Sequence, residues 1–408
     1  SSQGRAGSRW THASAARIAN LAESALATID QRTTLWELAR LFLKLGTTAF
    51  GGPAAHIAML QQEVVERRGW ISQAEFLDHL GASNLIPGPT STELVIYIGR
   101  KQGGWPGLLI AGTCFILPAA IMAGILAWAY VRYGSLPAVS GLLYGVKPVV
   151  IAIILEALWK LGRTAVKSIW LAIVGLVTLF LALVGVSPLL VLIVGGCLGI
   201  VVLLGPRRVR TALIPFLEAT SWMPGAAAAL PASPGLLAIF LIFVKIGSIV
   251  FGSGYVLLVF LDADLVERHG WLTQQQLLDA VAVGQVTPGP VFTTATFLGY
   301  LLHGTPGAIV ATVGIFLPAF VLVALSAPLI PKIRASRLAG AALDGINVAS
   351  LTLMALVTWQ LARSALVDWI SVALGVLSAV LLFRFPRLNS AWLIAAAGLI
   401  GAVRYAIS

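Results

Sequence analysis

The block Asn84-Leu85-Ile86-Pro87-Gly88-Pro89-Thr90-Ser91-Thr92 returns 201 positions later as Gln285-Val286-Thr287-Pro288-Gly289-Pro290-Val291-Phe292-Thr293. The same offset places Phe42-x-Lys44-x-Gly46 on Phe243-x-Lys245-x-Gly247. Residues on both sides of the block therefore repeat with it, which indicates two copies of one unit. An internal repeat with Pro/Gly-broken segments at matching places is typical of secondary transporters.

The composition is that of a protein embedded in a lipid bilayer. The chain is 58% hydrophobic and 11% charged, against roughly 25% charged residues in soluble domains. Segments 103–131, 168–206 and 302–331 contain no Asp, Glu, Lys or Arg. Such runs predict an all-α polytopic membrane protein and exclude a soluble enzyme, because about 20 apolar residues span a bilayer.

The remaining composition narrows the function classes further. The net charge of +11 is interpreted as loop charge that sets topology, not as a nucleic-acid surface. The two cysteines, Cys114 and Cys197, lie in apolar runs and predict no disulfide framework, metal site or redox pair. The chain has no Walker motif, which argues against an ATP-driven pump, and no cofactor motif, which disfavours a membrane-embedded reductase.

Each copy reads as two helical hairpins broken by Gly and Pro, followed by four conventional spans. The predicted hairpins cover 34–67 and 72–101, then 235–268 and 273–302. The predicted spans cover 104–131, 138–162, 168–185 and 188–205, then 305–330, 337–362, 367–384 and 389–406. We expect a disordered or surface tail over 1–32, a first repeat over 33–207, a linker over 208–234 and a second repeat over 235–408.

Loop charges predict that the two copies are inverted in the membrane. In the first copy, ten cations lie on one side and Arg132 alone on the other, so the first side is expected to be cytoplasmic. In the second copy the bias is reversed, with three cations on the equivalent side and five opposite. Inversion places the N-terminus inside and the C-terminus outside, and it requires the linker around 211–232 to cross the membrane. That linker is a poor span, because it contains Glu218 and three prolines.

The repeated Pro-Gly-Pro is expected to end one half-helix and to begin another. A half-helix N-terminus offers unpaired N–H groups and a partial positive charge, which suits an anion, and Ser/Thr hydroxyls can add donors. Two inverted copies would present two such ends near the midplane. The candidate site residues in and around the repeated block are Asn84, Pro87, Gly88, Thr90, Ser91, Thr92, Gln285, Pro288, Gly289, Thr293 and Thr294.

A second pair of breaks and two lysines complete the candidate site. The breaks fall at Gly51-Gly52 and at Gly252-Ser253, where missing or small side chains allow close backbone approach. Lys44 and Lys245 lie in apolar helix, where a charge is costly and usually functional. Two lysines and two helix N-termini would neutralise a dianion. The structural alternative is that each lysine snorkels, or pairs with an acid such as Glu37 or Glu93.

Several charged residues have no equivalent in the other copy. The positions equivalent to Glu93 and His56 in the second copy are Thr294 and Leu257. Either Glu93 or His56 could carry a proton coupled to anion movement. A packed, hydrogen-bonded imidazole is the alternative for His56. Lys147, opposite Asn347, is a further candidate cation. Three other sets of repeated residues are interpreted as structural. Glu66-Arg67 and Glu267-Arg268 are expected to form loop ion pairs, and Trp159/Arg163 and Trp359/Arg363 to form interfacial belts. Asp78 and Asp279 are also interpreted as structural.

Two longer motifs surround the breaks in each half. The first half carries Phe50-Gly51-Gly52-Pro53-Ala54-Ala55-His56-Ile57-Ala58 and Pro87-Gly88-Pro89-Thr90-Ser91-Thr92-Glu93-Leu94. The second half carries Phe251-Gly252-Ser253-Gly254-Tyr255-Val256-Leu257-Leu258 and 284–297. With these motifs the chain resembles the chromate ion transporter family in its long, two-domain form. The resemblance covers about residues 34–406. Thr90 stands where the family pattern leads us to expect Asn, which keeps a polar group there.

The resemblance implies chromate export from the cytoplasm across a bacterial inner membrane, driven by the membrane potential or a proton gradient, with chromate resistance as the outcome. Sulfate is the structural analogue of chromate. Uptake or exchange of sulfate or another tetrahedral oxyanion stays an alternative, as does an anion channel. We expect a non-enzymatic, multi-pass protein in the lipid bilayer, with no cofactor and no nucleic-acid partner. A homodimer is a hypothesis.

Overall fold

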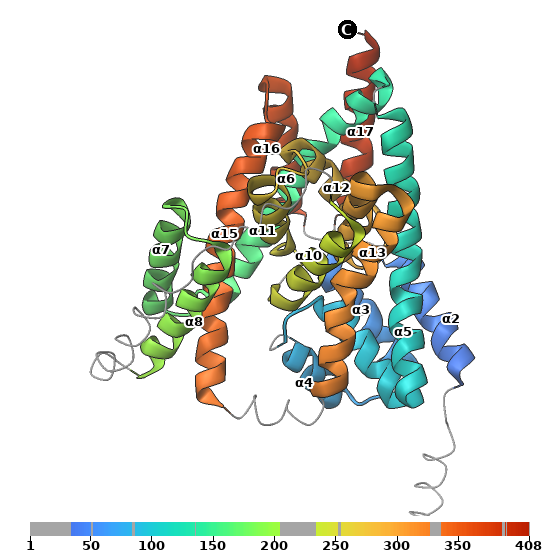
Figure 1. Ribbon diagram of the computed structural model, residues 1–408, viewed down its shortest axis with the longest axis vertical. Coiled ribbons are helices and arrows are strands. Elements are labelled where there is room, and N and C mark those ends of the chain that lie inside the picture. Colours follow the sequence, from blue (N-terminus) through green and yellow to red (C-terminus); the bar gives the residue numbers. More distant parts are fainter. Residues whose placement is uncertain are drawn as a thin grey trace, which may run out of the picture.

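The computed structural model describes residues 34–49, 52–83, 86–134, 136–204, 234–251, 254–326, 336–385, 388 and 390–407. These residues are almost entirely helical and form no strand (Figure 1). The predicted all-α fold is therefore confirmed. The predicted tail over 1–32 lies outside the described residues, and so does nearly all of the linker, including the expected crossing at 211–232.

The two halves contain matching helices in the same order. In the first half these are α2 (Leu35–Thr48), α3 (Gly52–Gln61), η1 (Gln62–Arg67), α4 (Gln73–Ser83), α5 (Thr90–Tyr133), α6 (Pro137–Ala165), α7 (Ile169–Leu183) and α8 (Pro188–Leu204). In the second half they are α10 (Leu236–Ile249), α11 (Leu257–Leu261), η2 (Asp262–Arg268), α12 (Gln274–Val286), η3 (Val291–Thr293), α13 (Thr294–Ser326), α15 (Arg337–Ala365), α16 (Trp369–Arg384) and α17 (Ser390–Ile407). Even the π-helical turns η1 and η2 recur at equivalent places.

Each of the longest helices, α5 and α13, is two helices joined at a glycine kink. The backbone leaves helical geometry at Gly103 and Gly104 in α5, and at His303 and Gly304 in α13. Gly104 and Gly304 both have φ of 61°, a left-handed conformation that glycine adopts without strain. The chain therefore turns back at these points, between the predicted hairpin and the predicted first span.

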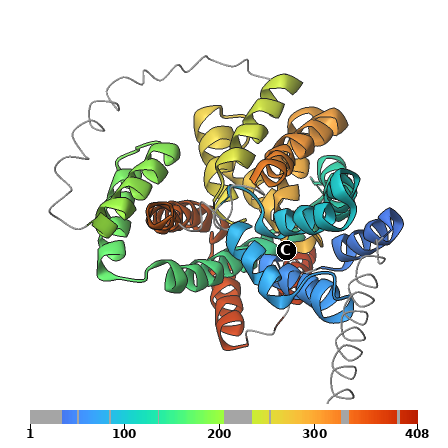
Figure 2. The same cartoon turned by 90° about the horizontal axis from the view of Figure 1, so that it is seen from below.

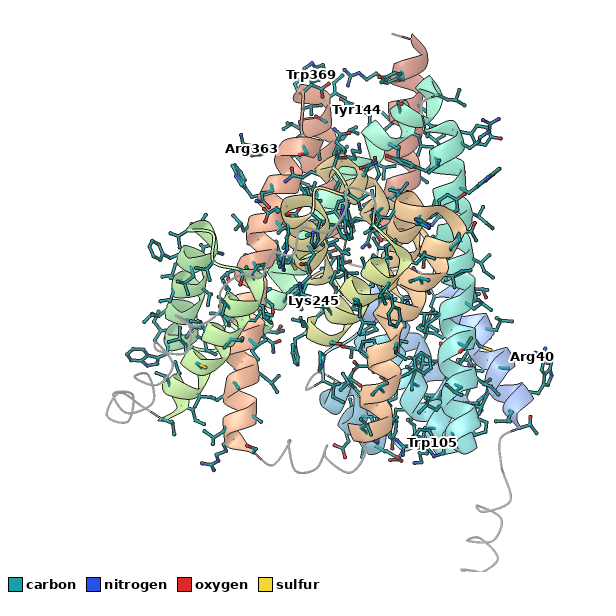
Figure 3. All side chains as sticks on the ribbon, in the orientation of Figure 1. Arg40, Trp105, Tyr144, Lys245, Arg363 and Trp369 are labelled. Carbon is teal, nitrogen blue, oxygen red and sulfur yellow. The ribbon has the colours of Figure 1, made fainter. Side chains whose placement is uncertain are left out.

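The two halves are inverted relative to each other. Tyr144, near the start of α6, and Arg363, near the end of the equivalent helix α15, both lie toward the upper end of the molecule (Figure 3). Helices α6 and α15 therefore run in opposite directions. Trp105, just after the α5 kink, lies at the lower end. Consistently, the described chain starts near the lower end with α2 and finishes at the upper end with α17 (Figure 1).

The last helices of each half pack on the other half. Helix α6 packs against α16 and α17, and its equivalent α15 packs against α7 and α8 (Figure 2). Glycines allow these contacts: a Cβ at Gly145 would clash with the backbone of α17, and a Cβ at Gly345 would clash with the backbone of α8. Close approach at small residues is a common way to pack helices in membranes. Because the last helices of each repeat pack on the other repeat, the two repeats form one structural unit.

An apolar surface surrounds this unit. Four helical segments of the described chain are long and apolar enough to cross a membrane: Thr90–Tyr133, Val139–Ala165, Val291–Leu325 and Arg337–Ala365. Helices α7, α8, α16 and α17 are apolar but shorter. The predicted belt residues Trp159 and Trp359 are 59% and 65% exposed. The architecture is that of a multi-pass membrane protein.

Candidate functional site at the junction of the two repeats

The two Pro-Gly-Pro segments meet at the junction of the repeats through a reciprocal pair of hydrogen bonds. The Gly88 amide donates to the Val250 carbonyl at 2.8 Å, and the Gly289 amide donates to the Ala49 carbonyl at 3.0 Å. Val250 and Ala49 are the C-caps of the equivalent helices α10 and α2. Each broken segment of one repeat therefore binds the helix end of the other.

Both positions require glycine. Gly88 has φ of 143° and Gly289 has φ of 94°, conformations that residues with a Cβ rarely adopt. A Cβ on Gly289 would also stand 2.7 Å from the Cβ of Ala119 on α5 of the other repeat. The recurring sequence block is thus a place where the two repeats approach each other closely.

Helix N-termini follow both segments, as predicted, but they differ in detail. Helix α5 begins at Thr90 directly after Pro89, whereas the second segment enters the 3-10 turn η3 before α13. The Thr293 and Thr294 hydroxyls donate to the Pro290 and Val291 carbonyls at 2.9 and 2.8 Å. Their oxygens can still accept a hydrogen bond, but their protons are already committed to the backbone.

The first-repeat terminus keeps an available hydroxyl. Thr92 is fully buried, and its Oγ1 has no hydrogen-bond partner among the described residues. Ser91 is also buried and lies 3.4 Å from Nδ1 of His56. An unpaired buried hydroxyl is costly and marks a place where a ligand oxygen can be received.

The two symmetry-related lysines are paired with acids that the sequence reasoning did not name. Lys44 Nζ lies 3.2 Å from Glu63 Oε1, and Lys245 Nζ lies 2.7 Å from Asp264 Oδ1. Glu37 and Glu93, the partners considered from the sequence, are not the ones found. Glu63 and Asp264 are themselves 201 positions apart, so a carboxyl conserved by the internal repeat was the available signal.

The charge balance of the two pairs differs. Glu63 also binds Arg67 at 2.9 Å and Arg68, so the first-repeat carboxylate faces three cations. Asp264 is bound by Lys245 through both of its oxygens, at 2.7 and 2.8 Å. Both carboxylates are buried, and Lys245 lies at mid-height in the molecule (Figure 3). The first pair therefore carries a surplus of positive charge, and the second is balanced.

His56 joins both repeats through one carbonyl. Its Nε2 lies 2.9 Å from the Ala49 carbonyl, the same oxygen that accepts the Gly289 amide. Because a carbonyl only accepts, Nε2 carries the proton, and Nδ1 of the neutral ring faces Ser91 as an acceptor. His56 is thus hydrogen-bonded on both nitrogens, the arrangement given as its structural alternative, and it sits at the junction itself.

Glu93 is the most isolated acid near the junction. It is 1% exposed, and neither carboxyl oxygen has a hydrogen-bond partner among the described residues. A Cβ on Gly88 would clash with Glu93 Oε1, so the carboxyl lies against the Pro-Gly-Pro backbone. An unpaired buried polar group costs several kcal/mol, so packing alone does not explain this carboxyl.

The remaining candidate residues are only partly placed. Gln285 is 9% exposed and accepts from the Tyr255 hydroxyl at 3.5 Å, while its Nε2 has no partner among the described residues. Gly52 begins α3. Asn84, Gly51, Gly252 and Ser253 lie outside the described residues.

The two hairpins beside the junction are packed differently. Helix α12 contacts α5, α6, α15 and α17, whereas its equivalent α4 has its main packing on α5. Leu278 on α12 is fully buried, and its counterpart Leu77 on α4 is 51% exposed. The second-repeat hairpin is therefore closed against the bundle and the first-repeat hairpin is not.

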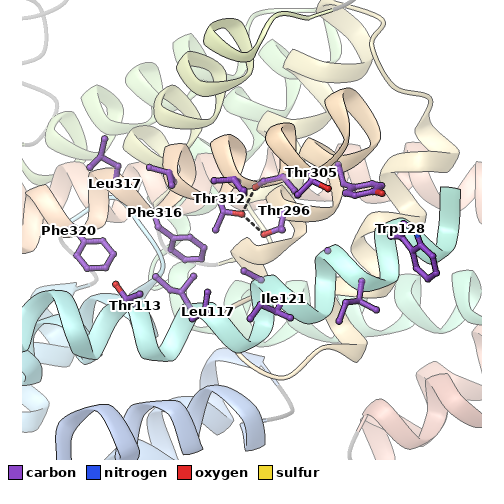
Figure 4. A pocket seen from close by; sticks show the side chains of 18 of the residues that line it. Thr113, Leu117, Ile121, Trp128, Thr296, Thr305, Thr312, Phe316, Leu317 and Phe320 are labelled. Carbon is purple, nitrogen blue, oxygen red and sulfur yellow. Dashed lines mark hydrogen bonds between the residues drawn. The ribbon is translucent and has the colours of Figure 1, made fainter. Parts of the chain in front are cut away.

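A cavity of 720 Å³ lies between α5 and α13, but its lining does not suit an anion (Figure 4). None of the described residues that line it is charged, and its polar groups include the Thr296 and Thr312 hydroxyls, 2.7 Å apart. Many lining side chains, such as Ile121 and Ile309, are more than half exposed. This groove fits hydrocarbon, so it is not a candidate for the anion site.

Comparisons with known proteins agree with this architecture. The chromate transporter family model matches residues 36–200 and 237–402, one match per repeat. A chromate transport protein of Cupriavidus metallidurans is 34% identical over 387 residues, covering 91% of this chain and 94% of the relative. One from Pseudomonas aeruginosa is 32% identical, covering 88% and 90%.

A probable chromate transport protein of Synechococcus elongatus is 34% identical, over 85% of this chain and 89% of its own. No solved structure matches the chain. The duplicated family match coincides with the two inverted helix sets and includes both Pro-Gly-Pro segments. The chain belongs to the chromate transporter family.

Proposed function

We propose that this protein is a secondary active transporter that exports chromate from the cytoplasm across the bacterial inner membrane by alternating access, and so confers chromate resistance. The observation that carries the proposal is the reciprocal pairing of the two Pro-Gly-Pro segments with helix ends of the opposite repeat. Each hydrogen bond holds the turn before one helix N-terminus against the opposite repeat, and we expect the two N-termini to face one site from opposite directions. Family membership supports chromate as the transported ion.

The unequal packing of the two hairpins supports alternating access. One hairpin is closed on α6, α15 and α17, and its symmetry mate is packed mainly on α5. Exchanging these two arrangements between the repeats would open the opposite end while the junction stays fixed. Transporters built from inverted repeats commonly move in this way.

We assign anion binding to the junction. The first turns of α5 and α13, with Thr90, Ser91, Thr92, Thr293 and Thr294, supply N–H groups and hydroxyls, and Lys44 and Lys245 supply positive charge. For a lysine to act on the anion, its carboxylate partner must release or share it. The local surplus of cations around Glu63 makes this easier at Lys44 than at Lys245.

The membrane potential favours export without any further energy source. Moving one elementary charge across a membrane at 100 mV is worth about 2.3 kcal/mol. A dianion leaving an interior-negative cell therefore gains about 4.6 kcal/mol. Because both repeats are in one chain, the proposed site does not require a homodimer. The mass of the purified protein in detergent tests whether a homodimer forms.

Transport of labelled chromate into everted membrane vesicles tests the function. We expect energised vesicles to accumulate chromate above its equilibrium level and excess sulfate to compete for the same site. Efflux is refuted if chromate never rises above equilibrium. Flux only down the gradient would identify a channel, and preference for sulfate over chromate would identify a transporter for other tetrahedral oxyanions.

Glu93 and His56 are proposed to couple protons to the anion. We expect Glu93→Gln to keep potential-driven chromate transport but to lose most of the stimulation by a pH gradient, about tenfold, because glutamine cannot exchange a proton. Uptake in vesicles with imposed pH gradients and a clamped potential measures this. Glu75→Gln, which removes a carboxylate paired with Lys101 away from the junction, is the control. Undiminished stimulation in Glu93→Gln removes Glu93 from the coupling.

A further inference from the structure

The two equivalent aspartates of the hairpins have opposite surroundings. Asp279 on α12 is 3% exposed, whereas Asp78, its counterpart on α4, is exposed. The same residue type at the same repeat position is thus buried against the bundle on one side and faces outward on the other. A difference of this kind reports the conformational state of each hairpin.

Asp279 is held by the other repeat. Lys147 Nζ on α6 lies 3.0 Å from Asp279 Oδ1, and the Tyr130 hydroxyl on α5 donates to Oδ2 at 3.0 Å. Lys147 also donates to Gln275 Oε1 at 3.0 Å, one turn earlier on α12. The side chains of Lys147 and Asp279 are only 11% and 4% exposed. Two helices of the first repeat therefore bind one helix of the second through a buried ion pair.

The repeat does not reproduce this ion pair on the opposite side. Asn347 stands on α15 where Lys147 stands on α6. If the first-repeat hairpin closed as the second one does, the repeat equivalence would bring Asp78 to a neutral amide at that position. An ion pair in one copy and an amide in the other give the two closed hairpins unequal stability, because a buried charge pair and an amide contact differ in energy.

A polar cavity of 610 Å³ lies directly beside the pair. Its lining includes Lys147, Asp279, Tyr130 and Gln275, together with Tyr144 near the upper end of the molecule (Figure 3). Around its rim, Tyr144 donates to Asp368 at 2.5 Å and Arg404 binds Asp368 at 2.8 Å. The cavity is therefore a polar vestibule, and the Lys147–Asp279 pair is part of its wall.

We propose that Lys147, Asp279 and Tyr130 form a latch that closes the upper end of the transport path, with the 610 Å³ cavity as its outer vestibule. The proposal rests on alternating access at the junction. Because Asn347 replaces the lysine in the other repeat, the latch exists on one side only. The latch holds the upper end closed, so the resting protein is open at the other end, where Lys44 and the first-repeat hairpin lie. Lys147, Asp279 and Tyr130 therefore act as positioning residues.

The sign of the effect follows from the burial of the pair. Removing either charge leaves the other buried without its partner in the closed state, whereas in the open state water can reach it. Lys147→Asn or Asp279→Asn therefore shifts the resting protein toward opening at the upper end. Reversing both charges, Lys147→Asp with Asp279→Lys, re-forms a pair and shifts it back.

A cysteine reporter under the closed hairpin tests the latch without any substrate. In a parent with Cys114→Ser and Cys197→Ser, Thr287→Cys places a thiol at a 5% exposed position at the C-terminal end of α12. Labelling by a membrane-impermeant maleimide is measured separately from each face of oriented vesicles. Reporters at Trp369 and Trp105, which are exposed at opposite ends of the molecule, identify which face is which.

We expect Lys147→Asn and Asp279→Asn each to raise labelling from the Trp369 face about tenfold or more, and to lower it from the Trp105 face. The charge-reversed pair should return both rates toward the parent. Unchanged rates in both single variants overturn the latch, as does an equal rise from both faces, which would be general loosening. Since no chromate is used, a latch without chromate transport would refute the proposed substrate and leave the latch standing.

Asn347→Lys is the matched variant in the other repeat. It places a lysine at the position equivalent to Lys147, so it should stabilise closure of the lower end and lower labelling from the Trp105 face. The opposite sign, or no change while the Lys147 variants respond, would overturn the repeat-based part of the proposal.

Discussion

Lys245→Met is expected to abolish chromate transport and to destabilise the protein, and adding Asp264→Asn should recover stability without recovering transport. In the single variant, Asp264 stays buried with its partner removed. Breaking a buried pair costs about 3–5 kcal/mol. The lower end applies here, about 3 kcal/mol, because the Lys245 side chain is 39% exposed and water can reach the site.

The equivalent substitution in the first repeat separates stability from function. Lys44→Met leaves Glu63 bound to Arg67 and Arg68, so it should destabilise by about 1 kcal/mol or less, near the value of a partly exposed ion pair. Transport should still be lost if, as proposed, Lys44 is one of the two cations that bind the anion. Lys44→Met and Lys245→Met are therefore expected to lose transport equally but stability unequally, because only Glu63 keeps other cations as partners.

Thermal unfolding in detergent and chromate uptake in everted vesicles measure the two effects. If Lys245→Met with Asp264→Asn regains both stability and transport, Lys245 acts only as a partner of the carboxylate and is not part of the anion site. If Lys44→Met unfolds as readily as Lys245→Met, Arg67 and Arg68 do not stabilise the buried Glu63 carboxylate, contrary to what their short distances to it indicate.

Gly289→Ala is expected to lower chromate transport at least tenfold by forcing the two repeats apart. Alanine at φ of 94° adds backbone strain of about 1–3 kcal/mol. Its Cβ would also stand 2.7 Å from the Cβ of Ala119, which displaces the Gly289 amide from the Ala49 carbonyl. A displacement of about 1 Å in a site can reduce a rate by about a hundredfold.

Gly270→Ala provides the matched control. Gly270 has φ of 61° in the same repeat, and a Cβ there meets no atom within 4 Å. It should therefore cost about 1–2 kcal/mol of backbone strain but leave transport near the parent rate. Adding Ala119→Gly to Gly289→Ala should recover part of the transport, because it removes the clash and not the strain. Equal loss in the Gly289 and Gly270 variants would mean that strain alone is measured.

Much of the fold could be predicted from the sequence because Pro and Gly act locally. The offset of the Pro-Gly-Pro blocks, the hairpins broken by Gly and Pro, and the loop charges together predicted helical repeats in inverted orientation. Proline removes a helical donor and glycine permits a left-handed turn wherever they occur, so these breaks need no tertiary information. The matched helices and the antiparallel α6 and α15 confirm this part.

The pairing of the charged residues could not be predicted in the same way. Lys44 lies 19 positions from Glu63, and Lys147 lies 132 positions from Asp279. Which acid meets which base depends on how the π-helical turns η1 and η2 rotate their carboxyls and on how tightly each hairpin packs. The repeat offset contained a signal for Glu63 and Asp264, but not for Lys147, whose counterpart is Asn347.

The amino-acid sequence alone was enough to predict a duplicated, membrane-embedded helical unit, and its two broken segments are expected to suit an anion. Hydrophobicity, Pro/Gly breaks and a repeat offset are properties of single positions and their spacing. The contacts that Gly88 and Gly289 each make with the opposite repeat, and the Lys147–Asp279 ion pair in one hairpin, became visible only in the folded chain. The two repeats have similar local sequences, and their unequal states arise from contacts between distant residues, which local patterns do not encode.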